Sequence, residues 1–129
     1  MIEHIGLVVT DSRAMAAWYA QHLGFDILRS FDTGSGHVAF IQSPATGLIF
    51  ELITHCDRPP IEPALSDPLQ FHIALKTDDI ICQRDRLVAA GATFVTDCPT
   101  DDPDARVMVL RDPWGLFIQL AQRRDDFYA

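Results

Sequence analysis

Cysteine, basic residues and long apolar runs are all scarce in this chain of 129 residues. Its three cysteines, Cys56, Cys82 and Cys98, are odd in number and form no CxxC pair, which argues against a disulfide framework and a cysteine zinc site. Only 10 Lys and Arg residues stand against 18 Asp and Glu residues, and the resulting net charge of −8 disfavours nucleic acid or an anionic membrane as partner. No segment reaches the roughly 18 apolar residues that span a bilayer. We therefore expect a small-molecule ligand and a reducing, cytoplasmic location.

The chain has enough apolar residues, 48%, for one compact domain, and it contains an internal repeat. A single shift in numbering aligns "IEHIGLVVTD" (Ile2–Asp11) with "QFHIALKTDD" (Gln70–Asp79). The same shift, without a gap, aligns "GLIFEL" (Gly47–Leu52) with "GLFIQL" (Gly115–Leu120). Two matched segments at one offset indicate a duplicated module.

The repeat pairs polar residues that stand inside apolar runs. His4 aligns with His72 and Glu51 with Gln119, so the spacing from each histidine to its polar partner is the same in both copies. Glu51 lies within "LIFELI", where an ionised carboxylate costs several kcal/mol unless it is paired, hydrogen-bonded or bound to a metal. Each copy therefore carries one histidine and one polar strand residue that need partners.

Each copy is predicted to fold as a strand, a helix and three further strands, so the fold class is α+β. Strands are expected near 2–9, 26–31, 37–43 and 48–54 in the first copy, and near 70–77, 93–97, 106–111 and 116–122 in the second. One helix begins at Asp11 or Ser12 and ends at Gly24; the other begins at Asp78 or Asp79 and ends at Gly91. The proline-rich segment 56–69 is a linker between module one, 1–55, and module two, 70–124.

The alternation of side chains along a strand predicts which residues share a face. His4 shares its face with Gly6, and His72 shares its face with Ala74. A small side chain close to a histidine on the same face leaves space for a ligand or an ion. If the two modules pack around a pseudo-twofold axis, the four polar side chains of the repeat can converge.

Four motifs together resemble the vicinal oxygen chelate superfamily over nearly the whole chain: "IEHIGLVVTD", "WYAQHLGF", "FHIALKTDD" and "DPWGLFIQL". This superfamily includes glyoxalase I, methylmalonyl-CoA epimerase, extradiol dioxygenases, thiol transferases that inactivate fosfomycin, and proteins that sequester bleomycin. The resemblance implies a curled, eight-stranded mixed sheet made of two βαβββ half-barrels within a single domain, 1–129. It also implies a metal bound by side chains on the first and fourth strands of each module.

Carried over to this chain, the resemblance implies the metal ligands His4, Glu51, His72 and Gln119. Two imidazoles, a carboxylate and an amide suit a divalent ion such as Zn, Ni, Co, Mn or Fe, with two positions left for substrate oxygens. The ion would stabilise an enediolate as a Lewis acid while Glu51, as catalytic base, removes a proton. We therefore expect a metal-dependent, glyoxalase-like enzyme of the lyase or isomerase type.

Gln119 departs from the pattern, because most catalytic relatives resemble one another in having a glutamate on the last strand. Two alternatives follow. An extradiol-type dioxygenase would use His4, His72 and Glu51 to hold iron. A non-catalytic, drug-binding protein of the bleomycin-resistance kind would have lost the metal, and the acidic chain suits a cationic drug.

Three further residues are candidates for a substrate pocket: Phe40, Arg106 and Met108, on corresponding strands of the two copies. Half-barrel modules have open sheet edges, which must be covered. We therefore expect a homodimer, as in many relatives.

Overall fold

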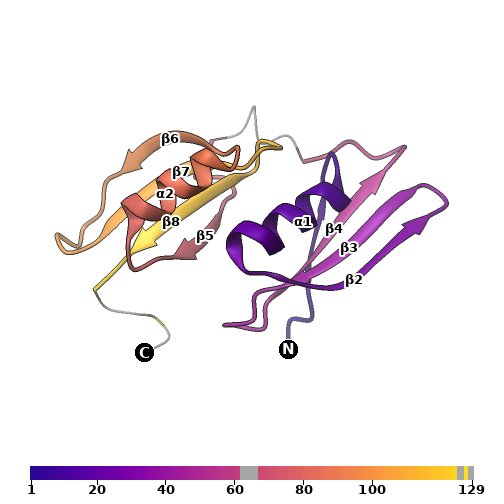
Figure 1. Cartoon of the computed structure of the whole chain (residues 1–129), viewed down its shortest axis with the longest axis horizontal. Coiled ribbons are helices and arrows are strands. Elements are labelled where there is room, and N and C mark those ends of the chain that lie inside the picture. Colours follow the sequence, from indigo (N-terminus) through magenta and orange to yellow (C-terminus); the bar gives the residue numbers. More distant parts are fainter. Residues whose placement is uncertain (62–66, 125–126, 128–129) are drawn as a thin grey trace. The chain divides into compact units, whose positions relative to one another are not determined.

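The computed structural model describes residues 1–61, 67–124 and 127, which form ten helices and strands (Figure 1). Module one contains β1 (Ile5–Val8), α1 (Ser12–Leu23), β2 (Asp26–Thr33), β3 (Gly36–Gln42) and β4 (Ile49–His55). Module two contains β5 (Ile73–Lys76), α2 (Ile80–Ala89), β6 (Thr93–Cys98), β7 (Arg106–Arg111) and β8 (Phe117–Gln122). The chain divides into two compact units after Ile61, within the predicted linker 56–69, of which 62–66 lie outside the described residues.

Helix α1 begins and ends where its capping residues predict. The side chain of Asp11 accepts a hydrogen bond of 3.0 Å from the backbone N–H of Ala14, which satisfies a free amide of the first turn. Gly24 ends the helix in the left-handed conformation, with φ of 71°, which a residue without Cβ adopts at little energetic cost. The helix buries Met15 and Tyr19, each only 1% exposed. Module one therefore has its core between α1 and one face of its sheet.

The sheet of module one has the order β1-β4-β3-β2. Strands β1 and β4 are parallel, and the remaining pairs are antiparallel. Burial alternates along β3 and β4: Ala39, Ile41 and Leu52 are each no more than 1% exposed, whereas Phe40 and Glu51 between them are half-buried. One face of this sheet therefore belongs to the core beneath α1, and the other carries Phe40 and Glu51.

Module two repeats this architecture, with the sheet order β5-β8-β7-β6 and parallel β5 and β8. Its helix α2 is capped by Asp79, whose side chain accepts a hydrogen bond of 3.0 Å from the N–H of Cys82. The predicted α+β fold of two βαβββ modules is confirmed, and the eight strands are divided equally between two hydrogen-bonded sheets. Neither helix, within the described part of the chain, is long and apolar enough to cross a membrane.

Each outermost strand of the antiparallel part carries a bulge. In β2, Ile27 pairs with Ile41 and Arg29 pairs with Phe40, so Leu28 is the extra residue. In β6, Val95 is the extra residue in the same way. Bulges increase the local twist and make an edge strand a poorer template for pairing with another chain.

Candidate metal centre

Two of the predicted ligands, His4 and Glu51, contact each other in module one. Glu51 lies on β4 and pairs with Gly6 of β1, and His4 lies immediately before β1. The Nε2 atom of His4 is 2.9 Å from Oε2 of Glu51, with the two side chains 33% and 22% exposed. The side chain of Glu51, within "LIFELI", thus lies on the face of the sheet opposite α1. There it contacts the imidazole of His4 and is partly exposed to solvent.

The His4 ring is held in place by two further contacts. Its Nδ1 atom is 2.8 Å from Oε1 of Glu3, and its edge meets the ring of Phe40 with centroids 5.6 Å apart and planes at 89°. Histidines that bind metals usually donate their second ring N–H to an oxygen, which fixes the tautomer and the ring orientation. Glu3 supplies such an oxygen, so the other nitrogen, Nε2, is the one turned toward Glu51.

The spacing of the two donor atoms fits a shared ion. Two ligands about 2.1 Å from one ion and at right angles to each other are about 3 Å apart. The observed separation of 2.9 Å between His4 Nε2 and Glu51 Oε2 matches this value. The same separation places the two atoms within ion-pairing distance of each other. The donor chemistry and spacing of module one therefore fit a divalent ion.

Open space lies beside this pair. Gly6 faces Glu51 across the parallel ladder, and a Cβ added to Gly6 would meet no atom within 4 Å. A side chain at this position would occupy the space next to the carboxylate. The sequence-based expectation that a small residue leaves room here agrees with this geometry.

In module two, the structure places His72 and Gln119 in the same ladder positions. Gln119 pairs with Ala74, just as Glu51 pairs with Gly6, and His72 lies immediately before β5. The N–H at Nδ1 of His72 donates a hydrogen bond of 2.7 Å to the backbone oxygen of Pro68, so Nε2 is the ring nitrogen that remains for another partner. Among the described residues, no hydrogen bond joins His72 to Gln119. The Nδ1 contact fixes the orientation of the His72 ring. In the part of the chain that the structure describes, His72 and Gln119 have no contact like the one between His4 and Glu51.

The other predicted pocket residues of module two, Arg106 and Met108, do not share a face with Gln119. Met108 pairs with Leu120 and Arg106 with Gln122, whereas Gln119 pairs with Val109. The Gln122 side chain accepts a hydrogen bond of 2.9 Å from the N–H of Ile80 in α2, so this is the face that α2 covers.

A one-residue shift explains this difference. Phe40 faces Glu51 in module one, and Val109 faces Gln119 in module two, so β3 and β7 correspond at an offset one residue longer than that of the outer segments. A shift of one residue moves a side chain to the opposite face of a sheet. Val109 and Arg111 therefore share the face of Gln119, whereas Met108 lies on the opposite face, and both Met108 and Val109 are buried, at 1% and 2% exposed.

A second histidine of module one, His37, belongs to the helix side. It is 7% exposed, and its Nδ1 lies 2.6 Å from Oγ of the fully buried Ser12 at the start of α1. Its Nε2 lies 2.9 Å from Oγ of Ser30. Because both ring nitrogens are engaged beneath α1, His37 is a structural residue rather than a ligand at the Glu51 face.

The sequence of this chain matches a known protein family. The profile of the Glyoxalase/Bleomycin resistance protein/Dioxygenase superfamily matches residues 1–120. The chain belongs to this superfamily. No curated protein matched the chain.

Several solved structures have the same fold as this chain. A glyoxalase family protein from Bacillus cereus has a TM-score of 0.73 and 18% identity, with 94% of this chain and 92% of that chain covered. The fosfomycin resistance protein FosX from Listeria monocytogenes, in a complex with Mn(II) and sulfate ion, has a TM-score of 0.70 and 18% identity, with 95% and 89% covered. TnmS3, an antibiotic binding protein from Streptomyces sp. CB03234, has a TM-score of 0.61 and 26% identity, with 94% and 96% covered. The same fold thus serves both a metal-containing protein and an antibiotic binding protein.

Proposed function

We propose that the protein is a metal-dependent, glyoxalase-like enzyme of the lyase or isomerase type that acts on a small oxygenated molecule. Its divalent ion would be bound by His4 and Glu51 together with their counterparts in the repeat, His72 and Gln119. The contact of 2.9 Å between His4 and Glu51 carries this proposal, because the spacing and the donor types fit two neighbouring ligands of one ion. We further propose a cytoplasmic homodimer.

The residues of module one have separate roles in the proposed reaction. A bound divalent ion would supply a Lewis acid that chelates two adjacent substrate oxygens and stabilises an enediolate. Glu51 is the one carboxylate of the ligand set, so it would remove the carbon-bound proton and return it to the neighbouring carbon. His4 would stay a ligand throughout, because Glu3 holds its Nδ1 proton. Phe40, on the face of Glu51, would provide an apolar wall for the substrate.

The exposure of the site suits a base that must exchange protons. Glu51 is 22% exposed and lies beside open space at Gly6, so a small substrate can reach the carboxylate. Gln119 has no acidic proton to exchange, so a mechanism with one base on each side of the substrate is disfavoured. The proposed reaction therefore moves one proton with one carboxylate, as an isomerase or lyase of this type requires.

A binding protein is the second candidate, because TnmS3 is an antibiotic binding protein and the chain has a net charge of −8. A cationic antibiotic would be attracted by that charge. In this case the His4 and Glu51 pair would form a hydrogen-bonding surface for the ligand, and no ion would be needed.

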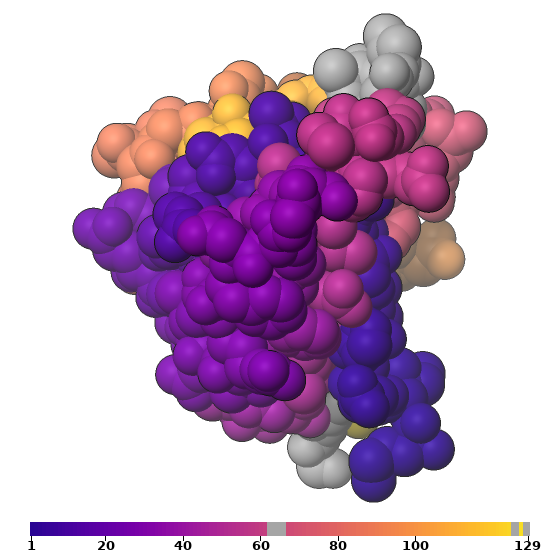
Figure 2. Space-filling model, turned by 90° about the vertical axis from the view of Figure 1, so that its right-hand side faces the viewer, coloured from indigo at the N-terminus to yellow at the C-terminus, as the bar shows by residue number. Residues whose placement is uncertain are grey.

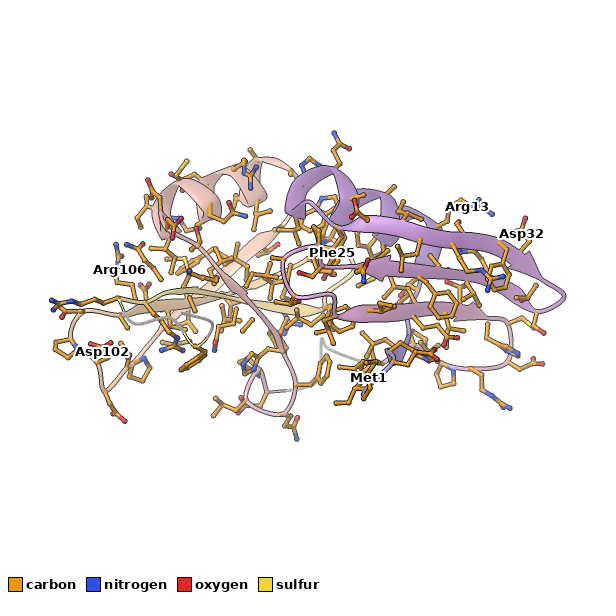
Figure 3. The ribbon with its side chains drawn as sticks, turned by 90° about the horizontal axis from the view of Figure 1, so that it is seen from below. Met1, Arg13, Phe25, Asp32, Asp102 and Arg106 are labelled. Atoms are coloured by element: carbon orange, nitrogen blue, oxygen red, sulfur yellow. The ribbon has the colours of Figure 1, made fainter. Side chains whose placement is uncertain are left out.

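Metal analysis separates the two candidates. Protein purified without chelators and supplemented with Mn²⁺ should retain one equivalent of ion per chain. Glu51→Gln should weaken binding by at least about tenfold, since it removes the charged ligand and keeps the side-chain shape. Asp32→Asn is the matched control: Asp32 forms an exposed ion pair of 2.7 Å with Arg13, whose side chain lies beside it in Figure 3, and the substitution should leave metal binding unchanged.

Activity assays complete the test. The metal-loaded parent should isomerise a hemithioacetal, and Glu51→Gln should abolish this activity. Gln119→Glu should raise metal affinity or turnover, because it adds a second carboxylate. A parent that binds no Mn²⁺ after supplementation, yet binds bleomycin or another cationic antibiotic in the presence of chelator, would refute the enzyme and support the binding protein.

A further inference from the structure

Three consecutive side chains with metal-binding atoms meet where β4 ends. His55, Cys56 and Asp57 each offer one ligand atom, and these three atoms all lie within 4.8 Å of one another. His55 is half-buried, and the other two are exposed. Figure 2 shows the segment that follows β4, in pink, on the surface of the molecule. Aqueous ions can therefore reach this cluster directly.

The backbone of this turn is fixed by its neighbours. The N–H of Cys56 donates a hydrogen bond of 2.8 Å to the oxygen of Ser35, in the turn between β2 and β3, and the N–H of Arg58 donates to the oxygen of His55 at 3.3 Å. Gly36 begins β3 so close to β4 that a Cβ there would overlap the backbone oxygen of Thr54. The three donor side chains therefore extend from a backbone held by hydrogen bonds and close packing, which lowers the entropy lost when an ion binds.

One ring nitrogen of His55 takes part in a hydrogen bond within the turn. The N–H of Asp57 donates a hydrogen bond of 3.0 Å to Nδ1 of His55, so Nδ1 carries a lone pair and the ring proton lies on Nε2. A cation bound at Nδ1 takes the place of this N–H, and the hydrogen bond from Asp57 is lost. Nδ1 of His55, Sγ of Cys56 and a carboxylate oxygen of Asp57 then form one set of donors.

We propose that His55, Cys56 and Asp57 form a surface binding site for a divalent ion that accepts sulfur ligands, with Zn²⁺ and Co²⁺ as the leading candidates. Thiolate and imidazole ligands select these ions over Mg²⁺ and Ca²⁺, which prefer oxygen. Three protein ligands leave one position of a tetrahedral ion for water. Binding forms a metal–sulfur bond and breaks the S–H bond, and the thiol proton passes to the solvent buffer. The site is independent of the proposed enzyme, whose ligands His4, Glu51, His72 and Gln119 contain no sulfur.

Cobalt reports on sulfur ligation selectively, because thiolate bound to Co²⁺ gives a strong charge-transfer absorption in the near ultraviolet. Reduced parent protein titrated with Co²⁺ without oxygen should develop this absorption to saturation, and Zn²⁺ should abolish it by displacement. Cys56→Ser should remove the absorption completely. Asp57→Asn, at an exposed position, should weaken Co²⁺ binding by at least about tenfold.

Two control variants make the test specific. Cys82→Ser replaces another exposed cysteine, in module two, and should keep the absorption of the parent. His4→Ala should also keep it, so failure of the proposed active site and failure of this site are distinguishable. Absence of the absorption in the parent would overturn the proposal. So would its survival in Cys56→Ser, its loss in Cys82→Ser, or an unchanged affinity in Asp57→Asn.

Discussion

Ser12→Ala tests whether a buried polar network holds α1 on the sheet that carries Glu51. The hydroxyl of Ser12 is fully buried and donates to the backbone oxygen of His37 at 3.0 Å. It therefore accepts from Nδ1 of His37 at 2.6 Å, and the hydroxyl of Thr54 lies 3.1 Å away. These contacts join the first residue of α1 to β3 and β4. The opposite faces of those two strands carry Phe40 and Glu51.

The cost of the substitution follows from the groups left without a partner. Alanine would leave Nδ1 of His37 unsatisfied in a position that is 7% exposed, at a cost of about 1–3 kcal/mol. The hydroxyl of Thr54 has a second acceptor, the oxygen of Val9 at 3.3 Å, so it adds little. The better helix propensity of alanine returns up to about 0.5 kcal/mol. We expect the free energy of unfolding to fall by about 2 kcal/mol.

Urea denaturation followed by circular dichroism measures this change, and Ser30→Ala is its matched control. Ser30 bonds to the other ring nitrogen of His37 at 2.9 Å but is itself exposed, so water can replace its hydroxyl and the loss should stay below about 1 kcal/mol. A loss in Ser12→Ala no larger than that in Ser30→Ala would refute the reasoning, since burial would then have no effect on the energy of the network.

Three further predictions follow from contacts described above. Glu3→Gln should lower metal affinity by about 10–100-fold, measured by titration calorimetry, and leave the metal-free protein equally stable, because Glu3 is 84% exposed and acts through the His4 ring. Gly36→Ala should destabilise the protein by about 1–3 kcal/mol in urea denaturation, since its Cβ would overlap the backbone oxygen of Thr54; an unchanged midpoint would contradict this close approach. Burial, and then the adjacent aspartate, raise the pKa of the Cys98 thiol, so a smaller fraction is thiolate at a given alkaline pH. Alkylation followed by mass spectrometry should show Cys98 reacting more slowly than the two exposed cysteines, and an equal or faster rate would contradict this prediction.

Local signals in the sequence were sufficient for the fold. Asp11 and Gly24 bound the first helix because a side-chain oxygen and a missing Cβ each satisfy a requirement of the nearest helix end. The pairing of each histidine with a strand residue could also be predicted, because β1 and β5, and likewise β4 and β8, correspond at one and the same offset in the sequence.

The position of Met108 could not be predicted from that offset. Arg29 pairs with Phe40, whereas Thr96 pairs with Val109, and the second pair lies farther apart in the sequence, so the second hairpin is longer. Shorter connections on either side restore the offset by the time β8 begins, and the match of the outer segments therefore conceals the shift between them. A shift of one residue changes no composition or periodicity, yet it moves every side chain of β7 to the other face.

Glu3 was missed for a different reason. The repeat aligns it with Phe71, so symmetry gives it no counterpart, and the second module uses the backbone oxygen of Pro68 for the same purpose. A carboxylate beside a candidate ligand histidine was the available signal. Residues that orient ligands depend on three-dimensional contacts more than on the ligands themselves, so a repeat in sequence identifies them poorly.

In module one, the backbone segments that carry His4 and Glu51 differ in how easily they open locally, because they occupy different places in the sheet. Glu51 lies on β4, which is hydrogen-bonded on both sides, whereas His4 precedes the edge strand β1. Local opening requires least free energy at sheet edges and chain ends, so the backbone amides around His4 should exchange with deuterium much sooner than those of β4. The backbone that carries Glu51 is thus more stable against local opening than the backbone that carries His4.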